Sequence, residues 1–77
     1  MSDQEFDDLV RRVQAVEIEI TRCDATVSRL WTGLIGLARL GIAASTEYDQ
    51  LVEVESERER LTLLREEFCA VLAHAGR

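Results

Sequence analysis

The sequence contains no proline and no lysine, and only four glycines among its 77 residues. Proline interrupts a helix because it lacks the backbone N–H and clashes with the preceding turn. Without it, glycine is the remaining strong helix breaker, and the glycines stand at 33, 36, 41 and 76. A long helix can therefore end only in the middle of the chain or at its last residues. We expect an all-α fold.

Positive charge is scarce as well, since nine arginines stand against fifteen acidic residues, for a net charge of -6. Binding to nucleic acid or to an anionic membrane requires a basic face, so we expect neither partner. The most apolar stretch, 30–44, is too short to span a bilayer and contains Arg39. No basic and apolar leader opens the sequence. These features predict a cytoplasmic protein.

The sequence has few residues that could form disulfides, bind a metal or catalyse a reaction. Two cysteines are too few for a disulfide scaffold, and with one histidine they do not form a metal-ligand set. With a turn centred near Ala43, Cys23 would face Leu63 and Cys69 would face Glu17. The two thiols would then be ~9 Å apart along the helix axis, too far for a disulfide. With no catalytic triad or phosphate loop either, we expect no enzymatic activity, cofactor or metal.

One pattern dominates what is present. From Phe6 to Leu37, apolar residues recur at alternating steps of three and four, which is an unbroken heptad repeat. Its members are Phe6, Leu9, Val13, Val16, Ile20, Cys23, Val27, Leu30, Leu34 and Leu37. Ser2, followed three residues later by Glu5, is typical of a helix start. The pattern predicts a first helix over about 3–40 with one stripe facing another helix.

The end of this helix is apolar around most of its circumference, which indicates burial by more than one neighbour. We assign the dimer or partner interface to Leu30, Trp31, Leu34, Ile35, Leu37 and Ala38. We expect Trp31 to be buried between the second helix and a second subunit. In the alternative, a docking surface would leave Trp31 exposed until a partner binds.

A turn at about 41–45 follows. Gly41 suits the position after a helix C-terminus, and Ser45 or Thr46 suits the N-cap of a second helix over about 46–75. The alternative is a break near 33–36, because glycine costs ~1 kcal/mol inside a helix.

The second helix carries a charged run, 55–60, in the middle of its apolar stripe. Since the run exceeds one turn, Arg58 or Glu57 must come near the seam between the helices, where an arginine can pair with a carboxylate. We assign an acidic face to Glu53, Glu55, Glu57 and Glu59.

Together these features predict a single domain, 1–77, formed by a long antiparallel hairpin of two helices. A chain of this size rarely has a sufficient core, so we expect homodimerisation into a four-helix bundle. Segments 1–27 and 45–77 each carry a net charge of -4, and 28–44 carries +2. This acidic rod favours a non-enzymatic interaction module that binds, and inhibits or occupies, a basic surface of a partner protein. A purely structural dimerisation subunit is the simpler alternative.

Two motifs carry resemblances. The segment S-T-E-Y-D at 45–49 resembles the S-Q-E-L-D motif of the small sporulation phosphatases, helical hairpins that act on the aspartyl phosphate of a response regulator. It matches at Ser45, Glu47 and Asp49, which implies that Glu47, Asp49 or Gln50 would orient water. The same residues also suit any helix N-terminus.

The second motif is W-T-G at 31–33, which is similar to the W-x-G tripeptide of the secreted family of acidic helical hairpins. That resemblance implies dimerisation and export without a cleaved signal. The turn expected here falls near residue 43, well after the tryptophan.

Overall fold

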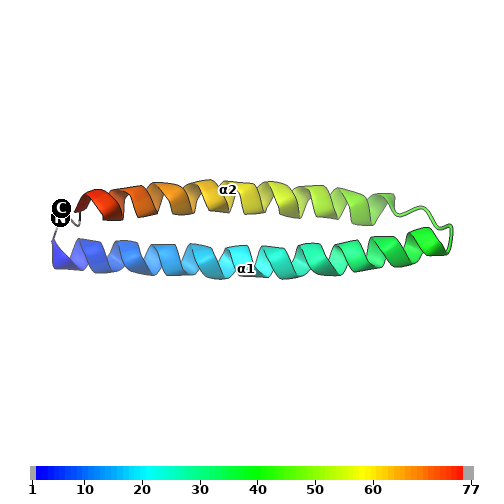
Figure 1. The fold of residues 1–77 in the computed structure, drawn as a ribbon, viewed down its shortest axis with the longest axis horizontal. Helices are drawn as coiled ribbons and strands as arrows, with labels where there is room; N and C mark the ends of the chain where they lie inside the picture. The colour runs from blue at the N-terminus through cyan, green and yellow to red at the C-terminus, as the bar shows by residue number, and fades with distance from the viewer. Residues whose placement is uncertain (1, 76–77) are drawn as a thin grey trace.

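The computed structural model describes residues 2–75, which form two helices, α1 (Asp3–Arg39) and α2 (Ser45–Ala75). The helices lie side by side and antiparallel, with the start of α1 and the end of α2 at one end of the rod and the connection at the other (Figure 1). The rod measures 58 × 15 × 14 Å. The predicted all-α helical hairpin is confirmed.

Helix α1 runs without interruption past both of its glycines. The alternative of a break near 33–36 is therefore wrong, and the W-T-G tripeptide lies inside the helix rather than between two helices. A Cβ added at Gly33 or Gly36 would meet nothing within 4 Å. These glycines therefore serve no close approach within the hairpin.

Ser2 is the N-cap of α1, in extended backbone conformation, and its Oγ accepts a hydrogen bond from the Glu5 N–H at 3.2 Å. Asp3 and Glu5 lie in the first turn, where the helix dipole favours negative charge. The predicted helix start is confirmed.

Gly41 terminates α1 as predicted. Its φ is +71°, a left-handed conformation that glycine adopts without steric cost. The Gly41 N–H donates to the Ala38 carbonyl at 3.1 Å, and the Ile42 N–H donates to the Leu37 carbonyl at 3.0 Å. These two bonds are the Schellman arrangement, which satisfies carbonyls that the helix end would leave without partners.

Helix α2 begins one residue earlier than expected. The Tyr48 N–H donates to the Ala44 carbonyl at 3.0 Å, so Ala44 flanks the helix and Ser45 already belongs to it. The assignment of Ser45 or Thr46 as N-cap is therefore wrong. The Schellman turn reverses the chain within the five residues 40–44, so helical geometry resumes immediately after Ala44.

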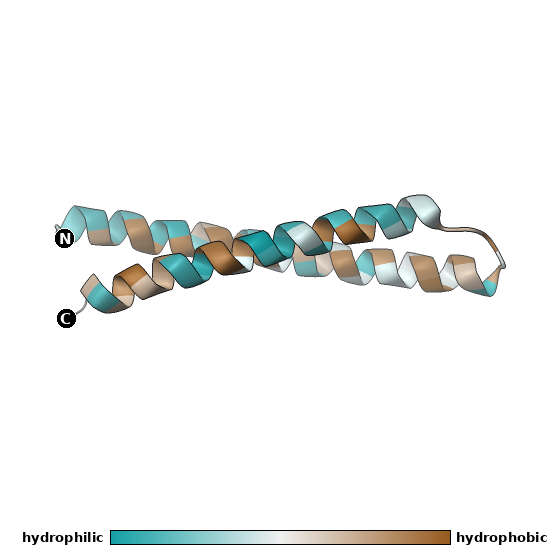
Figure 2. Cartoon of the chain, turned by 90° about the horizontal axis from the view of Figure 1, so that it is seen from above, coloured by the Kyte–Doolittle hydropathy of each residue, from teal (hydrophilic) through white to brown (hydrophobic). Residues whose placement is uncertain are grey.

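The core is a narrow line of side chains between the helices. The buried residues are Val16, Ile20, Leu30, Leu51 and Leu61. Cys23, Leu64 and Phe68 pack against the cluster formed by Val16, Ile20 and Leu61. Seen from above, the helices cross near the middle of the rod, with hydrophobic and hydrophilic turns alternating along each (Figure 2).

The cysteines are both free thiols. Cys23 is half-buried against the core, which confirms its role as a small hydrophobic residue, whereas Cys69 is exposed. Leu63, expected opposite Cys23, points outward, and Leu61 occupies the inner position instead. The connection between α1 and α2 spans 40–44 and is centred on Ile42, one residue before the expected centre.

Candidate interaction surface

The buried and half-buried residues of α2 follow a heptad repeat. This repeat is not evident from hydrophobicity alone, because two of its positions are arginines. Its inward positions are Leu51, Val54, Arg58, Leu61, Arg65, Phe68 and Leu72, all buried or half-buried. Two arginines therefore lie in the seam, seven residues apart. Arg58 was predicted there, whereas Arg65 was missed. A strict seven-residue count from Leu51 would have found both.

Arg58 makes the inter-helix contact predicted for it. Its Nε–H donates to Oδ1 of Asp24 on α1. This hydrogen bond raises the pKa of the Arg58 guanidinium, and the Asp24 charge acts in the same direction. A turn centred near Ala43 would have placed Thr62 opposite Asp24. The long arginine side chain instead reaches Asp24 from one turn closer to the tip.

The seam has two flanks, and two surface grooves show how they are composed. One groove contains Trp31, Ala38 and Tyr48, which share the heptad position immediately after the inner seam residues. The other contains Glu5, Arg12 and Val71, which share the position immediately before them. Each flank therefore contains equivalent positions from both helices.

We call the flank on the side of Trp31 and Tyr48 the acidic flank. Within residues 2–75, the charged residues at its heptad positions are all acidic, and the guanidinium of Arg58 reaches it from the seam at Asp24. These acidic residues are Asp3, Asp7, Glu17, Asp24, Glu55, Glu59 and Glu66, every one exposed.

The opposite flank, which we call the mixed flank, contains both signs. Arg22 pairs with Glu19 at 2.8 Å, and Arg60 pairs with Glu57. Arg60 also donates its Nε–H to Glu57 at 3.0 Å, and this bond holds the pKa of the Glu57 carboxyl below its ordinary value of 4.5. The charges of this flank are therefore partly neutralised within each helix.

The four glutamates assigned to one acidic face do not share one. Adjacent helical residues are ~100° apart, so alternate residues lie on nearly opposite sides of the helix. Glu55 and Glu59 lie on the acidic flank, whereas Glu53 and Glu57 lie on the mixed flank. The assignment of a single face was wrong because it followed the spacing in sequence rather than the helical period.

The acidic flank ends in an apolar groove at the tip of the hairpin, which we call the tip groove. Its volume is about 350 Å³, and it contains no charged residue. It is lined by Trp31, Leu34, Ile35, Ala38, Ile42, Ala44 and Tyr48. Trp31 is 47% exposed, Ile35 50% and Tyr48 57%.

The six residues assigned to the interface are thus divided by the structure. Leu30, Leu34 and Leu37 point toward α2 and are buried or half-buried. Trp31, Ile35 and Ala38 are exposed and line the tip groove. The hairpin alone does not bury Trp31, so its burial by a second subunit stays a prediction.

Ile42, Ala44 and Tyr48 complete the tip groove, and none of them was among the six predicted interface residues. They join Trp31 only because the chain reverses between them, which a periodic pattern within one helix cannot show. Tyr48 occupies on α2 the same heptad position as Trp31 on α1, and this equivalence is the signal that would have found it.

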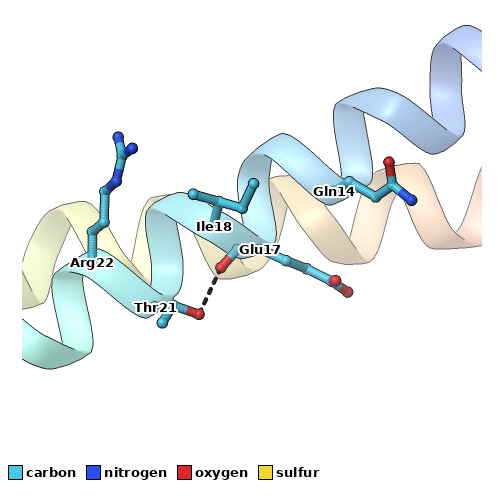
Figure 3. Close-up of a pocket in the computed structure, with 5 residues that line it drawn as sticks. All are labelled: Gln14, Glu17, Ile18, Thr21 and Arg22. Atoms are coloured by element: carbon cyan, nitrogen blue, oxygen red, sulfur yellow. Dashed lines mark hydrogen bonds between the residues drawn. The ribbon is translucent and has the colours of Figure 1, made fainter.

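A larger groove, of about 570 Å³, lies on α1 alone. Ile18 lies on the outer side of the helix, with Gln14, Glu17 and Thr21 toward the acidic flank and Arg22 toward the mixed flank (Figure 3). The Thr21 hydroxyl donates to the Glu17 carbonyl at 3.0 Å and is satisfied by its own helix. We therefore do not treat this open surface as a binding site.

The residues that would carry phosphatase chemistry do not line any of the three grooves described above. Glu47 is half-buried in the first turn of α2, and Asp49 and Gln50 are exposed beyond it. Within residues 2–75, no three His, Cys, Asp or Glu side chains come together in a way that would hold a metal ion. Over the same residues, neither helix is long and apolar enough to cross a membrane.

Comparisons of the chain with protein-family models, curated proteins and solved structures found no match.

Proposed function

We propose that this chain is a non-enzymatic interaction module that binds a basic surface of a partner protein through its acidic flank. The observation that carries this proposal is that the positive and negative charges are distributed unequally between the two flanks of the rod. Within residues 2–75, every charged residue at the heptad positions of one flank is a carboxylate, and that flank ends in an exposed apolar groove. The arginines of this part of the chain stand at positions in the seam, on the mixed flank or on the outer side, and Arg58 reaches the acidic flank at Asp24.

This arrangement matches what a basic partner surface requires. Complementary charge raises the rate of encounter and selects the partner. On the acidic flank the carboxylates of both helices supply this charge along the rod, up to the apolar groove at its tip. A partner that presents a row of arginine or lysine residues fits these carboxylates, and binding would occupy or inhibit that partner.

We further propose that the chain acts as a homodimer in which two hairpins form a four-helix bundle. The hairpin buries few side chains, and more large apolar residues are exposed than buried in residues 2–75. A chain below about 80 residues usually needs oligomerisation or another staple for stability. The free thiols suit a reducing cytoplasm, which we propose as its location.

The flank assignment is tested with two matched variants, Glu55→Gln/Glu59→Gln on the acidic flank and Glu53→Gln/Glu57→Gln on the mixed flank. Each removes two charges from the same stretch of α2. The probe is a synthetic amphipathic helical peptide rich in lysine and leucine, followed by fluorescence anisotropy at low and physiological salt. We expect the first variant to weaken binding several-fold more than the second. Equal losses, or an affinity insensitive to salt, would contradict the proposed role of the acidic flank.

A further inference from the structure

We propose that the second copy binds at the tip groove alone, with the two rods pointing in opposite directions. This inference rests on the proposed self-association and specifies its geometry. The interface is isologous: α1 packs against α1 of the second copy and α2 against its α2, so that a short four-helix bundle forms only where the two tips overlap.

The tip groove provides the apolar surface for this contact. It is uncharged, and both helices contribute to it, with Trp31 and Ile35 on α1 and Tyr48 on α2. Val52, one turn beyond Tyr48, is 46% exposed and extends the apolar surface along α2. A two-fold axis through this region would cover the same side chains on both chains at once, which is what an isologous interface requires.

The charges beyond the tip argue against a bundle along the whole rod. If both tips pointed the same way, α1 would lie over α2 of the second copy along the acidic flank. Glu17 would then stand level with Glu66 of the second copy, and Asp24 with its Glu59. Like charges brought together at an interface destabilise it, and among residues 2–75 the arginine that reaches this flank, Arg58, pairs with Asp24 rather than with Glu17 or Glu66.

Pointing the rods in opposite directions removes this conflict. The overlap then covers the uncharged groove, and the acidic parts of the two rods extend away from each other. Two rods of 58 Å that overlap over the roughly 12 residues from Trp31 to Ile42, or ~18 Å, give a dimer about 100 Å long. A bundle along the full length would keep the 58 Å of one rod.

The exposed thiol of Cys69 allows a direct measurement. Cys69 is 21 residues from Tyr48, or ~32 Å along the axis, so two spin labels at Cys69 would be about 60 Å apart in the dimer with opposed rods. With the tips aligned, the two α2 axes would be only ~14 Å apart across the bundle. The experiment uses the full chain carrying Cys23→Ala, labelled at Cys69, with pulsed electron spin resonance for the distance and light scattering for the mass.

Two groove variants, Trp31→Ser and Ile35→Gln, test which surface is used. Both residues are about half exposed, so we expect the variants to keep the helical circular dichroism signal while their dimer dissociation constants rise more than tenfold. Leu63→Ser is the control, because Leu63 is similarly exposed but lies on the outer side of α2, away from the groove. It should leave the dissociation constant within a factor of about two.

The label distance and the groove variants test the opposed orientation of the rods, whereas the mass tests self-association itself. A dimer with labels about 60 Å apart that is weakened by the groove variants supports it. A dimer with a short label distance overturns it and supports a bundle along the whole rod. A dimer insensitive to the groove variants also overturns it. A monomer at all concentrations overturns both this inference and the proposed self-association, while the peptide titration still tests the acidic flank.

Discussion

Arg58 of α2 and Asp24 of α1 form the one side-chain hydrogen bond that joins the two helices within residues 2–75. The other side-chain hydrogen bonds in this part of the chain connect residues three or four positions apart in the same helix. Arg58 is half-buried at an inner seam position, and its head reaches Asp24. A charged residue at such a position specifies register at a cost in stability.

We predict that Arg58→Leu raises the melting temperature of the hairpin. Leucine would fill the seam position completely, and replacing a partly solvated ion pair by packed apolar groups is often neutral or stabilising. Asp24→Asn, which removes the partner charge but adds no packing, should lower the melting temperature slightly. Thermal unfolding followed by circular dichroism measures both. A lower melting temperature for Arg58→Leu than for Asp24→Asn would show that the pair contributes more than packing.

Leu61 and Leu63 offer a matched test of the core. Leu61 is 7% exposed and belongs to the central cluster, whereas Leu63, two residues along the same helix, is 55% exposed. We expect Leu61→Ala to lower the free energy of unfolding by about 2–5 kcal/mol and Leu63→Ala to change it by no more than about 0.5 kcal/mol. Urea unfolding gives both values. Similar losses at the two sites would mean that Leu63 is covered by another chain.

The two glycines inside α1 should be replaceable. Gly33 and Gly36 have helical backbone and open space where a Cβ would lie, so alanine at either position should add about 0.8–1 kcal/mol of stability. Gly41→Ala is the control. Its left-handed conformation should make the same substitution cost about 1–2 kcal/mol. A loss of stability or of dimer formation with Gly33→Ala or Gly36→Ala would reveal close approach by a second chain.

The titration of Glu57 depends on Arg60. The hydrogen bond from Arg60 lowers the pKa of Glu57 in the folded chain below 4.5, so its contribution to stability is present above pH 4.5. That contribution is lost as the pH falls through the lowered value. In Arg60→Gln, we expect the Glu57 carboxyl to titrate closer to 4.5. Carboxyl chemical shifts from nuclear magnetic resonance would measure this, and an unchanged midpoint would contradict the pairing.

The hairpin was predictable because its signals are local. The heptad repeat of α1, the cap at Ser2 and the glycine at position 41 each act within a few residues, and all three occur in the structure. The seam of α2 was harder to recognise, because Arg58 and Arg65 interrupt its apolar pattern while Val52 and Leu63 lie outside it. Burial in the structure, rather than hydrophobicity, identified its inner positions.

The candidate surface was predictable only in part, because it combines residues from both helices and from the turn. Trp31, Ile35 and Ala38 could be grouped from the period of one helix, but Ile42 and Tyr48 join them through the turn. The acidic flank likewise depends on the register between two helices. A shift of a few residues would bring different carboxylates of α1 level with Glu55, Glu59 and Glu66 of α2. The Arg58–Asp24 pair that marks this register is seen in the structure, whereas the sequence predicted only that an arginine would pair with some carboxylate.

The rod holds its two ends at a fixed distance from each other. The distal ends of α1 and α2 lie together, far from the tip groove (Figure 1). A protein domain or fluorophore attached there would be held at nearly the full 58 Å from whatever the groove binds. Fusions at that end should leave the groove unobstructed, and energy transfer from Trp31 to an acceptor placed there would report whether the rod bends.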